Sequence, residues 1–193
     1  MSSKTASSGE VLAAALADAG IAIPHLWVEP GRYIVGNAVT LLATVGPVKK
    51  DIGMTWVNVD ASMNNLLQRE LNAVHYDVIP ASRMGEPFTQ NTTVVGPLCT
   101  GGPLAVDVLL PQVRRDDILA FLDAGMYAET FSTQFNGRPR PATVLVNEGN
   151  VELIKERESV RDVFARHRIP ERLRLPAAPE SVPGSRGGAA SLE

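Results

Sequence analysis

Short apolar segments, separated by proline and glycine, run through most of this chain and limit what it can fold into. They are rich in β-branched and aliphatic residues, and each has the length of a strand. Gly53 and Glu148-Gly149-Asn150 fall between successive segments and predict turns. The expected strands are residues 25–28, 41–48, 55–59, 74–79, 92–95, 104–110, 118–122, 143–146 and 151–155. The series predicts a β-barrel or a β-sandwich.

Helical patterns accompany the strands. Apolar side chains recur at helical spacing in residues 10–19, and Gly20 stands where a C-terminal cap would fall. Two further helices are expected, each after a residue whose side-chain oxygen can bind free amides of the first turn. They run from Asp60 or Ser62 through Leu71, and from Ser159 through Arg166. The predicted class is therefore mainly β with flanking helices, an α+β fold.

The composition narrows the possible functions. The chain has 193 residues, of which 45% are hydrophobic and 20% charged, so it carries enough apolar side chains for a folded core. A formal net charge of -3 offers no basic surface for nucleic acid or anionic lipid. No apolar window reaches the roughly 20 residues of a membrane-spanning helix. We therefore expect a cytoplasmic protein that binds neither nucleic acid nor membranes.

The motif Glu29-Pro30-Gly31-Arg32 is the first candidate site. Proline fixes its own φ and glycine permits close approach of a ligand to the backbone, so the motif forms a rigid, narrow ledge. The opposite charges of Glu29 and Arg32 could hold a cation and an anion at adjacent points. The alternative is a local ion pair at the end of a strand, which is common and weakly stabilising.

Cys99 and Tyr127 are the other candidates. Cys99 lies in a glycine-rich stretch where a thiol can be reactive, although a single cysteine after an apolar run is more often a small buried side chain. As the only cysteine it excludes an internal disulfide framework, and with three scattered histidines it gives no metal-ligand spacing. Tyr127 could offer its hydroxyl to a phosphate, or pack on the sheet with the hydroxyl in water.

Five segments in series resemble the C-terminal part of the diaminopimelate/ornithine/arginine decarboxylases, pyridoxal phosphate enzymes of the alanine racemase-like fold type. The likeness extends from about residue 10 to about residue 167 and is greatest to the diaminopimelate decarboxylases of that family. The segments are EPGRYIVGNA, VNVDASMNNLL, VVGPLCTGG, DAGMYAETFSTQFNGRPRPATVLV and VELIKERESVRDVF.

The resemblance implies an amino-acid decarboxylase of lysine biosynthesis, with an active site formed between two subunits. By this resemblance Glu29 contacts the pyridine nitrogen of pyridoxal 5'-phosphate, and Gly31 lets the backbone approach the cofactor. Arg32 and Tyr127 hold the phosphate and the substrate side of the cofactor. Cys99, beside Thr100 in the substrate site, approaches from the neighbouring subunit and donates the proton that replaces carbon dioxide. The implied partner is a second copy or a barrel-bearing chain.

Several positions depart from the family pattern. The diaminopimelate decarboxylases read the distal end of the substrate with an Arg-Pro-x-Leu-Tyr segment, and the matching arginine and tyrosine positions hold Gln68 and Asn72. Arg69, one position along, could partly restore the charge. Thr100 replaces an acidic residue, and the Gly-Asp that follows is shortened to Gly102-Pro103. These changes argue against diaminopimelate as the substrate.

The resemblance also predicts the domain organisation. Residues 1–9 are expected to form a flexible leader, 10–35 the last helix and strand of a missing (β/α)8 barrel, 36–173 the β domain, and 174–193 a disordered tail. In this family the barrel carries the lysine that binds the cofactor, so the isolated chain is expected to lack it and to be inactive. The alternatives are a regulatory pseudoenzyme that binds a full-length relative and a free-standing module for a small ligand.

Overall fold

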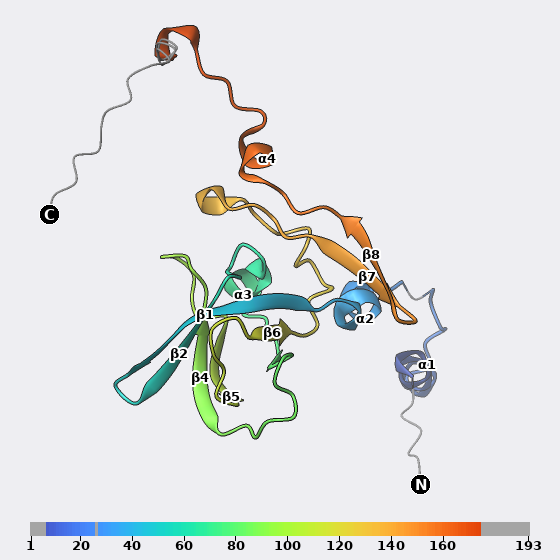
Figure 1. The fold of residues 1–193 in the computed structure, drawn as a ribbon. Helices are drawn as coiled ribbons and strands as arrows, with labels where there is room; N and C mark the ends of the chain where they lie inside the picture. The colour runs from blue at the N-terminus through green and yellow to red at the C-terminus, as the bar shows by residue number, and fades with distance from the viewer. Residues whose placement is uncertain (1–6, 26, 175–193) are drawn as a thin grey trace, which may run out of the picture. The chain divides into compact units, whose positions relative to one another are not determined.

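A computed structural model describes residues 7–25 and 27–174, and it divides the chain into two compact units, Met1–Thr133 and Gln134–Glu193. The first unit is built on a six-stranded sheet with the strand order β3-β6-β1-β2-β4-β5 (Figure 1). Its strands are β1 (Leu41–Asp51), β2 (Met54–Val59), β3 (Val78–Ile79), β4 (Gln90–Val95), β5 (Ala105–Leu110) and β6 (Ile118–Phe121). The outer strands β3 and β5 approach each other, so the sheet is nearly closed and barrel-like. The predicted mainly β class is confirmed.

The sheet forms where the sequence alternates apolar residues between turn residues. In β2 the buried positions Thr55, Val57 and Val59 alternate with more exposed ones, as expected when one face covers a core. The turn into β2 uses positive φ at Ile52 (47°) and Gly53 (75°), which confirms the predicted turn. β1 pairs antiparallel with β2 and β6, whereas β2 and β4 are parallel. Side chains from these strands and their connections meet in one core, which includes Val45, Leu66, Tyr76, Val94, Leu104, Leu110, Leu119 and Phe121.

The helices of the first unit are short. The helix predicted over residues 10–19 is α1 (Ser8–Asp18), which begins earlier because the Ser7 hydroxyl and the Glu10 carboxylate form a capping box. The others are α2 (Gly31–Val35), followed by the 3-10 turn η1 (Gly36–Ala38), and α3 (Leu67–Asn72).

The prediction of a strand over residues 25–28 is wrong for residues 25, 27 and 28, which the structure describes. His25, Trp27 and Val28 have no regular structure, and Trp27 and Val28 are 90% and 68% exposed, while residue 26 lies outside the described part. A strand is stable only when its amides bond a neighbouring strand, and no described strand pairs with this segment. The motif 29–32 therefore leads into α2 and does not end a strand, so the expected last barrel strand is not formed here.

The helix predicted from Asp60 or Ser62 starts later than expected. The Asp60 carboxylate accepts a hydrogen bond from the Thr44 amide (2.7 Å) across the sheet, and the Ser62 hydroxyl accepts one from the Asn64 amide (3.2 Å) in a turn. Both side chains are engaged elsewhere, so α3 begins at Leu67 without a side-chain cap. The strand expected over 74–79 is likewise reduced to β3, because only Val78 and Ile79 pair with β6.

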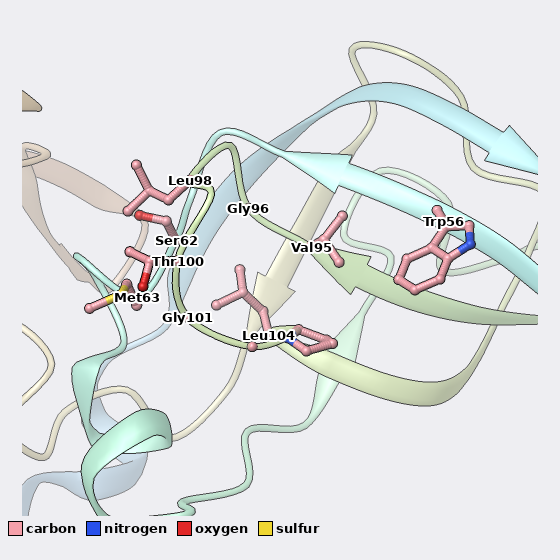
Figure 2. Close-up of a pocket in the computed structure, with 11 residues that line it drawn as sticks. Trp56, Ser62, Met63, Val95, Gly96, Leu98, Thr100, Gly101 and Leu104 are labelled. Carbon is pink, nitrogen blue, oxygen red and sulfur yellow. The ribbon is translucent and has the colours of Figure 1, made fainter. Parts of the chain in front are cut away.

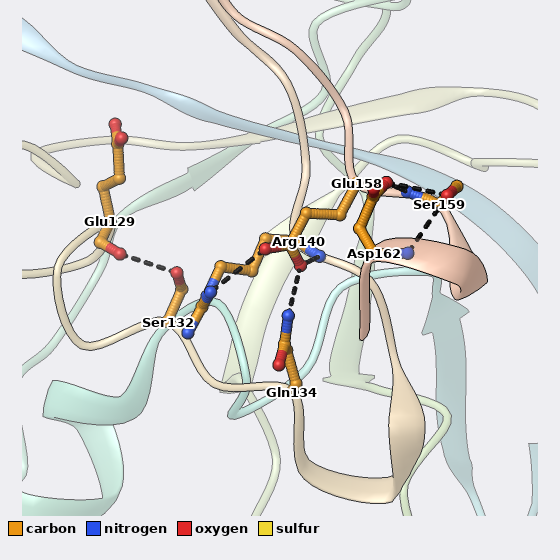
Figure 3. Close-up of polar contacts among 7 residues, drawn as sticks. All are labelled: Glu129, Ser132, Gln134, Arg140, Glu158, Ser159 and Asp162. Carbon is orange, nitrogen blue, oxygen red and sulfur yellow. Dashed lines mark hydrogen bonds and ion pairs between the residues drawn. The ribbon is translucent and has the colours of Figure 1, made fainter. Parts of the chain in front are cut away.

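The second unit contains the hairpin of β7 (Thr143–Asn147) and β8 (Asn150–Lys155), then α4 (Val160–Phe164) and the 3-10 turns η2 (Phe135–Gly137) and η3 (Glu171–Leu173). Glu148 (φ 48°) and Gly149 (φ 84°) make the predicted hairpin turn. Ser159 caps α4 in a capping box with Asp162, as predicted, although the helix stops before Arg166 (Figure 3). These turn and cap predictions are confirmed.

A carboxylate anchors the start of this unit. Glu158 accepts hydrogen bonds from Gln134 Nε2 (2.9 Å), from the Arg140 amide (2.9 Å) and from Arg140 Nη1 (3.1 Å), as Figure 3 shows. The hydrogen bonds from Gln134 and Arg140 lower the pKa of Glu158.

The predicted domain boundaries stay predictions, and the expected tail falls almost entirely outside the described residues, as does most of the leader. Within the described part, no helix is long and apolar enough to cross a bilayer.

Candidate functional site

The Glu29–Arg32 motif forms the approach to α2. Pro30 precedes the first turn of the helix, and the Gly31 amide donates to the Glu29 carbonyl (2.9 Å). Both charged side chains are exposed. Among the described residues, neither Glu29 nor Arg32 has an ion-pair or hydrogen-bond partner for its side chain, so the local ion pair that the sequence left open is not formed. A carboxylate and a guanidinium therefore remain available for a ligand.

Tyr127 lies in the loop that follows β6. Its backbone has a positive φ of 60°, and so does Asp123 with 56°, which costs free energy in residues other than glycine and is typical of functional loops. The ring is half exposed and stacks on Phe131 with a centroid distance of 5.4 Å. Phe131 thus packs against the ring, while about half of the residue stays exposed.

The loop of Tyr127 and the segment that begins at Gly31 meet through their backbones. The Gly125 amide donates to the Gly36 carbonyl and the Ala124 amide to the Val39 carbonyl, each at 2.9 Å. Gly125 is packed so closely that a Cβ there would lie 1.6 Å from the carbonyl oxygen of Val35. A Cβ built on Gly31 would lie 3.8 Å from the Tyr127 hydroxyl. The structure thus places the Tyr127 hydroxyl close to Gly31, so two residues predicted for the site are neighbours.

Tyr76 is a neighbour of this region that the sequence did not single out. It is 1% exposed, and its hydroxyl has no hydrogen-bond partner within the described residues. Burial raises the pKa of Tyr76, while the positive charge of Arg32 partly opposes the shift. The segment around Tyr76 has only the pattern of a strand, so nothing in the sequence linked the two residues.

Cys99 lies on the loop between β4 and β5, and its side chain is exposed. The alternative of a small buried side chain is therefore wrong. A cavity of about 290 Å³ opens beside this loop (Figure 2). Its lining includes Ser62, Met63, Leu98, Thr100, Gly101 and Leu104. Thr100, the residue after Cys99, thus borders this cavity. No described hydrogen bond or ion pair joins Cys99 or Thr100 to the side chains of Glu29, Arg32 or Tyr127.

Near this loop, α3 carries the residues that depart from the family pattern. Gln68 is 4% exposed, and Asn72 Nδ2 donates to its Oε1 at 2.5 Å. One hydrogen bond thus joins the two amides, and neither side chain carries a charge. Arg69 points its Nε to the backbone carbonyl of Pro103 at 2.7 Å. In the part of the chain that the structure describes, no cluster of His, Cys, Asp and Glu side chains could bind a metal ion.

Comparison with known proteins identifies the family. Residues 32–125 match the family described as pyridoxal-dependent decarboxylase, C-terminal sheet domain. The diaminopimelate decarboxylase of Methanothermobacter thermautotrophicus is 38% identical over 159 residues, which cover 82% of this chain and 37% of that protein. The enzyme of the same name from Archaeoglobus fulgidus is 42% identical over 149 residues, which cover 77% of this chain and 35% of that protein.

A solved structure agrees with this match. Diaminopimelate decarboxylase from Methanocaldococcus jannaschii, in complex with L-lysine, has a TM-score of 0.75 and 29% identity, covering 86% of this chain and 38% of the other. The nearly closed sheet thus resembles the β domain of decarboxylases with the alanine racemase-like fold. The chain belongs to the pyridoxal-dependent decarboxylases through their C-terminal sheet domain, as its sequence predicted. It spans between 35% and 37% of the length of these two curated relatives.

Proposed function

We propose that this chain is the C-terminal portion of a pyridoxal phosphate-dependent amino-acid decarboxylase, and that a barrel-bearing partner must complete its active site. The observation that carries the proposal is the approach of Tyr127 to Gly31. It joins two motifs of the decarboxylase family, and a carboxylate and a guanidinium without side-chain partners flank Gly31. A buried or mutually paired Glu29 and Arg32 would have argued against it.

The side chains of this region fit the chemistry of pyridoxal phosphate. Glu29 offers a carboxylate that can hold a proton on a ring nitrogen, and Arg32 offers a guanidinium suited to a phosphate. The Tyr127 hydroxyl can donate to the same phosphate, and Gly31 leaves room for the approach. When bound, pyridoxal phosphate accepts the electron pair that remains after carbon dioxide departs. Thr100, beside the cavity of the cysteine loop, is proposed to contact the substrate together with Arg32 and Tyr127.

Cys99 is proposed to donate the proton that replaces carbon dioxide. Its thiol is exposed, and no described hydrogen bond joins it to Glu29 or Tyr127, which fits a residue that serves the site of a second subunit. A general acid must come within hydrogen-bond reach of the atom that it protonates. The assembly proposed is therefore a dimer, with the barrel supplied by the partner.

Exposed apolar surface supports a partner. Both faces of the β7–β8 hairpin carry large exposed side chains, and a two-stranded sheet is marginally stable alone. These side chains are Val144, Leu145, Val146, Val151, Leu153 and Ile154. In the first unit Trp27 and Tyr33, on either side of the ledge, are also exposed. We propose that a partner covers this apolar surface in a cytoplasmic enzyme of lysine biosynthesis.

A second candidate is a regulatory pseudoenzyme that binds a full-length relative without catalysis. The neutral pair Gln68 and Asn72 favours it, because these residues stand where relatives of the family read the substrate with arginine and tyrosine. The same pair weighs against diaminopimelate as a substrate, since a distal carboxylate would find no cation there. Arg69, the cation one position along, donates its Nε to the backbone carbonyl of Pro103.

Cofactor trapping tests the proposal. The chain is mixed with the part of the M. thermautotrophicus enzyme that lies outside the match, with pyridoxal phosphate, and reduced with borohydride. The expected result is a complex that retains the cofactor, attached to a lysine of the partner, and that retains it poorly with Glu29→Gln or Tyr127→Phe. Glu152→Gln, an exposed change on β8, is the control. Equal retention by all variants would contradict the roles given to Glu29 and Tyr127.

A further inference from the structure

The loop that carries Cys99 is tied at its far end to two successive residues of α3. Arg69 Nε donates to the carbonyl oxygen of Pro103 at 2.7 Å, and the Gly102 amide donates to Glu70 Oε1 at 2.9 Å. The partners are 34 and 32 positions apart in the chain, so these bonds hold two distant segments together. Neighbouring residues of the helix thus bind neighbouring residues of the loop.

The rest of the loop lies against the segment that leads into α3. A Cβ on Gly96 would lie 2.5 Å from the carbonyl oxygen of Ala61, and one on Gly101 would lie 2.9 Å from the sulfur of Met63. Gly101 has a φ of 81°, which side chains other than glycine rarely adopt. Figure 2 shows Met63 beside Thr100 and Gly101 along this loop. The contacts of Gly96 and Gly101 are packing contacts. Where the loop joins β5, the Leu104 amide donates to the Val94 carbonyl at 2.8 Å, and the described hydrogen bonds from the loop to α3 are those of Arg69 and Glu70.

The Cys99 thiol has no anchor of its own. Its side chain is exposed and forms no described hydrogen bond, so its position is set by the backbone of the loop. Two successive glycines, Gly101 and Gly102, give that backbone more conformational freedom than other residues would. A charged donor and a charged acceptor make stronger hydrogen bonds than neutral groups do, which suits them to restrain such a segment.

We infer that Arg69 and Glu70 are positioning residues, which hold the Cys99 loop against α3 and so fix where the thiol is presented. The consequence for catalysis rests on the proposed role of Cys99. The restraint of the loop by Arg69 and Glu70 does not depend on that role. One hydrogen bond contributes enough free energy to shift the equilibrium between a held and a released loop by roughly fivefold. Loss of either side chain is therefore expected to release the loop measurably.

The test uses the only cysteine of the full chain as a reporter. A nitroxide label on Cys99 gives a spectrum that separates restrained from mobile populations. In Arg69→Ala and Glu70→Ala the mobile fraction is expected to rise by roughly fivefold. Glu70→Gln keeps an oxygen acceptor for the Gly102 amide and is expected to restore most of the restraint. Leu71→Ala, an exposed change in the same helix, is the matched control and is expected to leave the spectrum unchanged.

The inference is overturned if both alanine variants give the wild-type spectrum, or if Leu71→Ala mobilises the label equally. A second arm measures turnover by the unlabelled chain with the barrel partner. Glu70→Ala is expected to lower kcat roughly fivefold with little change in KM, and an unchanged kcat would refute the link to catalysis. If no mixture turns over, the proposed function fails by itself, and the label spectra still decide whether Arg69 and Glu70 hold the loop.

Discussion

Replacement of Gly125 by alanine tests the junction on which the candidate site depends. The Gly125 amide donates to the Gly36 carbonyl, and the new Cβ would lie 1.6 Å from the carbonyl oxygen of Val35, 2.7 Å from its carbonyl carbon and 3.0 Å from the oxygen of Gly36. Ordinary contacts between carbon and oxygen are no shorter than about 3.3 Å, so the two backbones must move apart by about 1.5 Å or more. Atoms of the backbone cannot rotate away as a flexible side chain can.

The cost of this separation can be worked from its parts. Crowding of a packed site costs about 1–3 kcal/mol. The hydrogen bonds from Gly125 and Ala124 across the junction contribute about 1 kcal/mol each, and one or both would be lost. The reduced freedom of the unfolded chain returns about 0.4–1 kcal/mol. We therefore expect Gly125→Ala to lower the free energy of unfolding of the first unit by about 1–4.5 kcal/mol.

Urea unfolding followed by the fluorescence of Trp56, on β2 of the same unit, measures this change. Gly85→Ala is the matched control, because a Cβ there meets no heavy atom within 4 Å and its free energy of unfolding should change by less than about 0.5 kcal/mol. Gly125→Ala is also expected to weaken retention of pyridoxal phosphate, since Tyr127 would move away from Gly31. A Gly125→Ala variant as stable as Gly85→Ala would refute the close approach of the two segments.

Two further predictions concern buried or bonded carboxylates. Burial raises the pKa of Asp117, but hydrogen bonds from Arg83 and from the Arg114 amide outweigh burial, so the net shift is downward. The ionised carboxylate therefore stabilises the fold above its unfolded pKa of about 3.9. This stabilisation is lost as the pH falls through the lower pKa of the folded state. Asp117→Asn should therefore flatten the loss of stability measured by urea unfolding between about pH 5 and pH 3, and an unchanged slope would contradict this. Glu158→Ala should speed amide exchange of residues 134–140 several-fold, measured by mass spectrometry, while exchange in the first unit stays as it was. Equal protection would contradict the anchoring role of Glu158.

The strands of the sheet were predictable because their residues carry a local signal. Runs such as 41–48 and 104–110 combine β-branched residues with proline or glycine at their ends, and the structure forms β1 and β5 there. The segment 25–28 was predicted on similar grounds, but no described strand pairs with it. The residues of a segment do not show whether a partner strand is present. Asp60 does not cap the helix for a related reason: its carboxylate accepts a hydrogen bond from the Thr44 amide, which lies on another strand.

The candidate site was predictable in its residues and not in its contacts. The charges of Glu29 and Arg32 and the glycine between them are visible in the sequence. The approach of Tyr127 to Gly31 depends on backbone hydrogen bonds between distant segments, for which the sequence has no periodic pattern. The bonds of Arg69 and Glu70 to the cysteine loop were missed for the same reason. In this helix Gln68 and Asn72 stood out as departures from the family pattern, and Arg69 only as a residue that could replace the lost charge.

Release of carbon dioxide by the assembled enzyme tests the central claim most directly. The chain and the barrel part of a relative are each assayed alone and then together, with lysine, ornithine and diaminopimelate as trial substrates and pyridoxal phosphate present. The account predicts no turnover by this chain alone, turnover of at least one amino acid by the mixture, and its loss with Cys99→Ala. A mixture that forms a stable complex and releases no carbon dioxide, or turnover that Cys99→Ala leaves intact, would contradict it.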